Sequence, residues 1–280
     1  MRFWLSIFLI LSCVLHTTCP GEIHKDSHLG QKVKDQIERL SHEERLFLEK
    51  FFRKLIRSED LGYVLFGSKP ACLSGYFIRL PLGNMLRGAD NFAIKKGWEV
   101  WKKYEYLFPH PKYLIFEETH VRGDETIHPI YFINKTNLLR ILREQEEVFK
   151  KELIDNFNPE RFLEDLCAKQ SLSEMIKSHE GLLGILLGYG VESSMSYHRR
   201  DLMWKSQMPL LCEEVNLEAV SQYNFRNPIF EDIHPIQFMG NPQSQEVQAI
   251  LEQNAKERSH LINIYSQGRW LEITLNKLVE

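Results

Sequence analysis

A cluster of acidic and histidine side chains lies between residues 117 and 128. Its carboxylates are Glu117, Glu118 and Asp124, and its imidazoles are His120 and His128. If residues 113–120 form a strand, Glu118 and His120 point to the same face, because successive side chains of a strand alternate. A return strand could then bring His128 opposite them. Two imidazoles and a carboxylate suit zinc, so Glu118, His120 and His128 are the predicted metal ligands.

The alternative for this cluster is a polar hairpin tip, where acids and histidines face water. The spacing of the cluster fits no known zinc signature, and the chain has no HExxH motif. Apart from zinc at this place, no cofactor is expected.

A second candidate site is aromatic. Trp98, Trp101 and Tyr104 recur at helical spacing and could form a platform for a ligand. The alternative is that they pack in the core, as aromatic residues at this spacing commonly do.

Two short motifs bear on other functions. Arg122-Gly123-Asp124 is the tripeptide that integrins recognise on an exposed loop, although three residues recur often by chance. Ser193 and Ser194 lack the sequence context of a nucleophile elbow, so they are not predicted to be catalytic. No residue is assigned a catalytic role, and the chain as a whole favours a protein that is not an enzyme.

The first nineteen residues have the pattern of an export signal. Arg2 supplies a positive charge, and residues 3–15 are almost all apolar. This stretch is shorter than the roughly 20 apolar residues of a membrane-spanning helix. Residues 1–19 are therefore predicted to be a signal peptide or lipoprotein signal, and the protein to be periplasmic, anchored to a membrane by lipid, or secreted. The alternative is a buried N-terminal helix.

Cys13 and Cys19 are the candidates for lipidation. Ile10-Leu11-Ser12-Cys13 resembles a bacterial lipobox, and Thr17-Thr18-Cys19 is a looser match. Ordinary cleavage near residues 19–21 without a lipid is the alternative. Later segments are too short to span a membrane, so no transmembrane helix is expected in the mature chain.

The other three cysteines, Cys72, Cys167 and Cys212, lie far apart and show no CxxC pairing. They are predicted to be free thiols, although one disulfide with a cysteine left over is also open. The charge is near neutral: 35 basic and 38 acidic residues give a net charge of −3. That balance supplies no electrostatic attraction for nucleic acid, which is not an expected partner.

The sequence pattern predicts helices and strands that would position the candidate residues above, in a mainly α-helical α+β fold. Residues 20–30 are predicted to be a polar tether, and residues 31–280 a single globular domain of helices around a small antiparallel sheet of hairpins. A hairpin is expected from residues 63–66 and 71–80, and two further strands at 113–116 and 130–133. Gly184 and Gly188 predict close packing of their helix against a second backbone. Helices are expected at 31–40, 41–57, from 90, 137–153, from 159, 171–188 and from 244.

Three functions remain open on this evidence. The leading hypothesis is a non-catalytic binding module of the cell envelope that takes a protein partner or a small ligand. The second is an exported hydrolase, either metal-free or dependent on a metal held by Glu118, His120 and His128. The third is a secreted effector or adhesion factor acting through Arg122-Gly123-Asp124.

Overall fold

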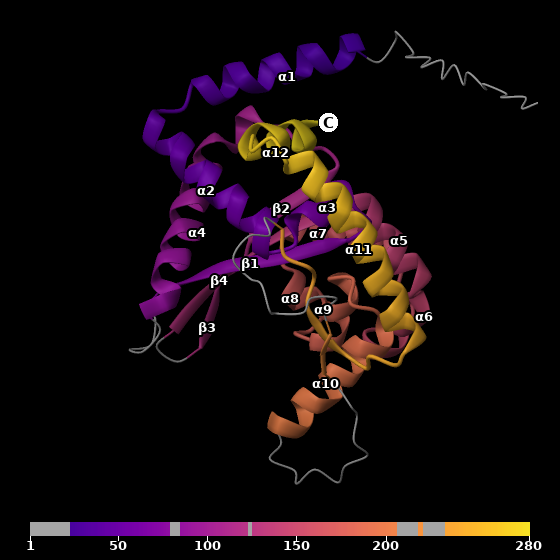
Figure 1. Cartoon of the computed structure of the whole chain (residues 1–280). Coiled ribbons are helices and arrows are strands. Elements are labelled where there is room, and N and C mark those ends of the chain that lie inside the picture. Colours follow the sequence, from indigo (N-terminus) through magenta and orange to yellow (C-terminus); the bar gives the residue numbers. More distant parts are fainter. Residues whose placement is uncertain (1–22, 79–84, 123–124, 206–217, 221–232) are drawn as a thin grey trace, which may run out of the picture.

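The computed structural model describes residues 23–78, 85–122, 125–205, 218–220 and 233–280. It has an α+β fold that is mainly helical, with a small antiparallel sheet, as predicted. Figure 1 shows the sheet in the middle of the molecule with helices on both sides. The helices are α1 (Ile23–Glu38), α2 (His42–Ser58), α3 (Leu61–Phe66), α4 (Met85–Tyr104), α5 (Lys135–Glu144), α6 (Glu146–Glu152), α7 (Pro159–Lys169), α8 (Leu172–Met175), α9 (Glu180–Leu186), α10 (Val191–Lys205), α11 (Gln245–Tyr265) and α12 (Trp270–Val279).

The main sheet is built around its longest strand, β4 (Glu125–Asn134). One side of β4 pairs with β1 (Ala71–Ile78), and the other side pairs with β2 (Tyr113–Glu117) and then with β3 (His120–Arg122), all antiparallel. The strands predicted at 113–116 and 130–133 are thus confirmed as neighbours, with Ile115 opposite Phe132. A second, two-stranded sheet joins β5 (Glu218–Val220) to β6 (Phe238–Gly240).

The main sheet separates two apolar cores. Alternate residues of β4 face opposite sides, so Ile130 and Phe132 enter the first core while Tyr131 and Ile133 enter the second. Helices α1, α2, α3, α4, α11 and α12 contribute to the first core, and α5 to α9 to the second. Both faces of the sheet are covered, which explains the continuous apolar run from Ile130 to Ile133.

Several predicted helix starts are confirmed by their caps. The Ser41 hydroxyl accepts from the backbone N–H of Glu44, whose carboxylate accepts from the Ser41 N–H in return. Asn134 caps α5 and Asn158 caps α7, each through its side-chain oxygen. Two starts lie earlier than predicted, because α4 begins at Met85 and α1 at Ile23. The described part of the predicted tether is therefore helical.

The hairpin predicted from residues 63–66 and 71–80 is wrong in its first half. Residues 61–66 form the helix α3, and β1 pairs with β4 instead. A short apolar run has no periodicity that separates a buried helix from a buried strand. Here Leu61, Tyr63 and Val64 are all fully buried in the first core, so the helix has no polar face to reveal it.

The helix predicted over residues 171–188 is interrupted. It divides into α8 and α9, with Lys177 and Ser178 between them in the left-handed region at φ 53°. The predicted cap at Ser171 makes no side-chain hydrogen bond, and His179 caps α9 instead. The segment predicted at 137–153 is likewise divided, into α5 and α6.

The predicted close approach at Gly184 is confirmed. A Cβ on Gly184 would lie 2.6 Å from Oγ and 2.8 Å from Cβ of Ser194, which belongs to α10. Gly188 instead ends the turn after α9 with φ at +81°.

The described helices include none that is long and apolar enough to cross a membrane. Cys72 and Cys167 are free thiols, one buried and the other half-buried, as predicted. Cys212 lies outside the described residues.

Candidate functional site

The register of the sheet decides where the predicted metal ligands lie. Glu117 is opposite Ile130, His120 is opposite Ile127, and His128 is opposite Tyr76. Side chains of directly opposed residues share a face, so His128 lies on the side of Glu117, toward the first core. Glu118 and His120 lie on the other side. The structure therefore brings Glu118 and His120 together but not His128.

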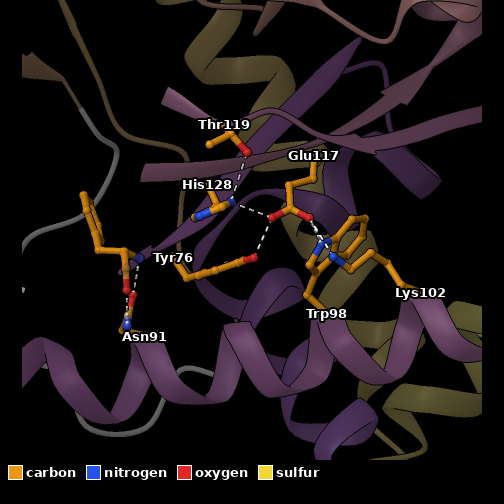
Figure 2. A network of polar contacts seen from close by, with 8 residues as sticks. Tyr76, Asn91, Trp98, Lys102, Glu117, Thr119 and His128 are labelled. Carbon is orange, nitrogen blue, oxygen red and sulfur yellow. Dashed lines mark hydrogen bonds and ion pairs between the residues drawn. The ribbon is translucent and has the colours of Figure 1, made fainter. Parts of the chain in front are cut away.

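Glu117 is the centre of a polar network on the first face, which Figure 2 shows. Its Oε1 accepts from the Tyr76 hydroxyl at 2.5 Å and lies 2.8 Å from Nδ1 of His128. Its Oε2 accepts from Trp98 Nε1 at 2.6 Å and from Lys102 Nζ at 2.9 Å. The Tyr76 and His128 rings stack with centroids 4.6 Å apart.

These contacts keep Glu117 ionised. Burial by itself raises the pKa of this carboxyl, but the hydrogen bonds from Tyr76, Lys102 and Trp98 outweigh burial and lower it to about 2. A carboxylate with such a low pKa and three hydrogen-bond donors is a weak base with little capacity left for a ligand. The network instead joins α4 to β1, β2 and β4. Asn91 adds to this junction, since its amide pairs with both the N–H and the C=O of Phe77.

The aromatic residues proposed as a ligand platform are part of this same junction. Trp98 is 2% exposed and Trp101 is fully buried, where it packs edge-on against Phe52. The Tyr104 hydroxyl donates to the Glu44 carboxylate. Trp98 and Trp101 therefore belong to the first core, and Tyr104 lies half-buried at its edge.

Glu118, on the opposite face, organises a second polar group. It is 8% exposed, and its Oε2 lies 2.9 Å from Nε2 of His120. The same carboxylate accepts from the backbone N–H of Ser173 at 3.1 Å and from the Ser173 hydroxyl. Ser173 belongs to α8, so this contact links the β2–β3 edge of the sheet to the helices of the second core.

A cleft of about 240 Å³ opens beside this group, and we call it the His120 cleft. Its walls are apolar and come from Leu73 of β1, from Ile127, Pro129 and Tyr131 of β4, and from Ile176 and Leu183. Its polar residues are His120, Ser173, Ser178, His179 and Glu180. An apolar cleft with a few convergent polar groups is the usual form of a small-ligand site.

His179 is fixed at this cleft by three contacts. Its Nδ1 accepts from the backbone N–H of Leu182 at 3.1 Å, and its Nε2 lies 3.4 Å from the Glu152 carboxylate. Its ring stacks on His198 of α10 with centroids 3.7 Å apart. Burial and the nearby His179 both lower the pKa of His198, because a second positive charge at this distance is unfavourable.

The backbone that leads into His179 is strained. Lys177 and Ser178 both adopt left-handed φ values, which are uncommon for residues other than glycine. Such strain concentrates at ligand and active sites. Here it carries the Ser178 side chain to the cleft.

The polar groups at the His120 cleft are not arranged as a hydrolytic triad. The Ser173 hydroxyl and the His120 ring both contact the Glu118 carboxylate, so the histidine does not lie between serine and acid as in a hydrolytic triad. Among the described residues, no group of three or more His, Cys, Asp or Glu could hold a metal ion.

Several residues of the cleft could not be found from the sequence. Ser173, Ser178 and His179 lie in the segment predicted as one helix, and a continuous helix would carry them away from the sheet. The signal was the polar run Lys177-Ser178-His179, which interrupts the apolar spacing.

Cys13, Cys19 and Asp124 lie outside the described residues, as does Gly123 of the predicted adhesion motif.

Comparison of the chain with protein-family models, with curated proteins and with solved structures finds no match. The assignment of a function rests on the geometry of the chain itself.

Proposed function

We propose that this protein is a non-catalytic binding protein that takes a small ligand in the His120 cleft. The observation that carries the proposal is the pairing of His120 with the buried Glu118 carboxylate at an apolar cleft. The carboxylate occupies Nε2 and fixes the ring, as carboxylates do for functional histidines. The Nδ1 atom is then the ring nitrogen available to a ligand.

The shape and polarity of the cleft indicate the class of ligand. A volume of about 240 Å³ suits a compound of one or two rings, since an engineered cavity of roughly 150 Å³ holds benzene. With Nε2 donating to Glu118, the neutral His120 ring offers Nδ1 as an acceptor. The favoured ligand therefore has an apolar ring and an O–H or N–H donor.

Titration of histidine-labelled protein with p-cresol tests this proposal. We expect p-cresol to shift the imidazole NMR signals of His120 and His179, and toluene, which lacks the hydroxyl, to bind at least 5-fold more weakly. His120→Ala should remove that preference for p-cresol. His260→Ala, at an exposed position of α11, is the matched control and should preserve it. The same affinity of p-cresol for wild type and His120→Ala would contradict the proposal.

We further propose that the protein acts outside the cytoplasm, on the support of the pattern in residues 1–19. The intact mass of the protein from its native host tests this. A chain that begins at Cys13 or Cys19 and carries acyl groups would be a lipoprotein, and a shortened chain without lipid would be a free exported protein. An intact Met1 would contradict export.

The hydrolase is the second candidate, and the Glu118–His120 pair is the observation that favours it. A carboxylate that orients an imidazole also serves general bases. Zinc content separates the two candidates: about one zinc per purified chain would favour the metal-dependent hydrolase, and the binding protein is expected to hold far less than one.

A further inference from the structure

A second cavity lies between α9, α10 and β6, next to the His120 cleft. Its volume is about 220 Å³. We call it the serine pocket, because Ser193 and Ser194 of α10 line it. It shares Glu180 and Leu183 with the His120 cleft, but its other residues are different.

Three aromatic side chains line the serine pocket. Tyr189 and Phe238 stack with centroids 5.4 Å apart and ring planes within 7° of parallel. Lys69 Nζ lies 4.2 Å from the centre of the Tyr189 ring and fixes it further. Tyr197, which is 40% exposed, also lines the cavity. Such a preformed wall favours a flat, aromatic ligand.

The two serine hydroxyls are the feature that ordinary packing does not explain. Ser193 is 2% exposed and Ser194 is 4% exposed. Neither hydroxyl has a hydrogen-bond partner within the described part of the chain. A buried hydroxyl without a partner is destabilising, and buried polar groups are nearly always paired. An acceptor inside the pocket would satisfy both hydroxyls.

The charges around the pocket narrow the class of ligand. Glu180 is the charged residue among those that line it, so a carboxylate ligand would meet repulsion. The rest of the lining cannot solvate an isolated charge. A cavity of this volume takes about two fused rings, by the same comparison with benzene.

We propose that the serine pocket binds an uncharged aromatic compound of about two rings whose carbonyl oxygen accepts from the hydroxyls of Ser193 and Ser194. The site is independent of the ligand proposed for the His120 cleft. It would let the protein hold two small molecules in adjacent cavities along α9, or one compound of this class alone.

Calorimetric titration of the full chain with 1-indanone and with indane tests the proposal. The two probes share a ring system, and only the first has a carbonyl. We expect wild-type protein to bind 1-indanone about 25-fold more tightly than indane, because each of the two hydrogen bonds contributes about 5-fold. Ser193→Ala and Ser194→Ala should each lower the affinity for 1-indanone about 5-fold and leave that for indane unchanged.

Ser196→Ala is the matched control. Ser196 is a buried serine of the same helix, but its hydroxyl accepts from Arg199 and it does not line the pocket. This variant should bind both probes as wild type does. His120→Ala should also leave 1-indanone binding unchanged, which separates a failure of this site from a failure of the His120 cleft.

The melting temperature of the unliganded protein gives a second readout. Ser193→Ala and Ser194→Ala remove unpaired hydroxyls, so each should match or exceed the wild-type melting temperature. Three results would overturn the proposal: no binding of either probe at millimolar concentration, unchanged 1-indanone affinity in both serine variants, or a clear loss of melting temperature in both, which would mean that enclosed water already pairs the hydroxyls.

Discussion

Neighbouring carboxylates can have opposite roles when they point to opposite faces of a strand. Glu117 accepts three hydrogen bonds and forms one ion-pair contact with α4 and the sheet. Among the described residues, Glu118 bonds to His120 and Ser173. The first is a structural junction, and the second orients a histidine at a cleft. The sequence showed both acids but not their roles, because roles depend on which helices cover each face.

The register of the sheet explains why His128 lies on the opposite face from Glu118 and His120, the other two predicted zinc ligands. Arg122 pairs with Glu125, which fixes the register of the whole hairpin and places residue 128 opposite residue 119. Shifting a register by one residue would move every side chain to the other face. The sequence shows which residues of one strand share a face. Which residues of the neighbouring strand lie on that same face depends on the length of the turn between them.

Glu117→Gln should destabilise the fold by about 2 kcal/mol at pH 7, because it removes a charge that three buried or half-buried groups and the exposed Lys102 contact. The pKa of this carboxyl falls from 4.5 to about 2 on folding, so its stabilisation is complete above about pH 4.5 and is lost as the pH falls toward 2. Urea unfolding of both proteins at pH 7 and pH 3 measures this. The difference should shrink at pH 3.

Glu99→Gln is the control on the same helix, since Glu99 forms an exposed ion pair with Lys96. It should change the free energy of unfolding by less than about 0.5 kcal/mol. If Glu117→Gln lowers the free energy of unfolding equally at both pH values, the loss comes from the shape or hydrogen bonding of the amide and not from the missing charge.

At the scale of elements, caps and long amphipathic helices were predictable, and short buried ones were not. Ser41, Asn134 and Asn158 act through local hydrogen bonds that the sequence displays. The helix α3 and the break between α8 and α9 depend on tertiary burial and on strained residues. The His120 cleft lies at that break, so the part of the fold that escaped prediction is also the part that builds the candidate site.

Gly184→Ala tests the packing of α9 on α10. Alanine favours a helix more than glycine does by up to about 1 kcal/mol, but here its methyl group would lie 2.6 Å from the Ser194 hydroxyl. The two helices would have to separate, so we expect a net loss of about 1–3 kcal/mol in the free energy of unfolding. Gly30→Ala in α1 is the control, because nothing lies within 4 Å of the added carbon. It should be neutral or stabilising. A stabilised Gly184→Ala would mean that the helices do not pack this closely in solution.

At the scale of the molecule, the two cores share one sheet and should not unfold separately. Each strand supplies alternate residues to both cores, so loss of the second core removes the cover from one face of β1, β2 and β4. Of the five tryptophans of the chain, Trp98, Trp101 and Trp270 lie in the first core. When Trp4 and Trp204 are replaced by phenylalanine, the remaining fluorescence reports on the first core, which a substitution in the second core does not touch.

Leu166→Ala tests whether the two cores unfold together, because Leu166 lies in the second core and the remaining tryptophans report on the first. Leu166 lies in α7 and is fully buried in the second core, so its truncation should cost about 2–5 kcal/mol. If the sheet couples the cores, tryptophan fluorescence and far-ultraviolet circular dichroism will shift to the same lower urea midpoint. Ile154→Ala, at a position 57% exposed, should leave both midpoints unchanged. A fluorescence midpoint that stays at the wild-type value while circular dichroism shifts would show instead that the first core survives alone, and that the helices around both proposed pockets form a separate folding unit.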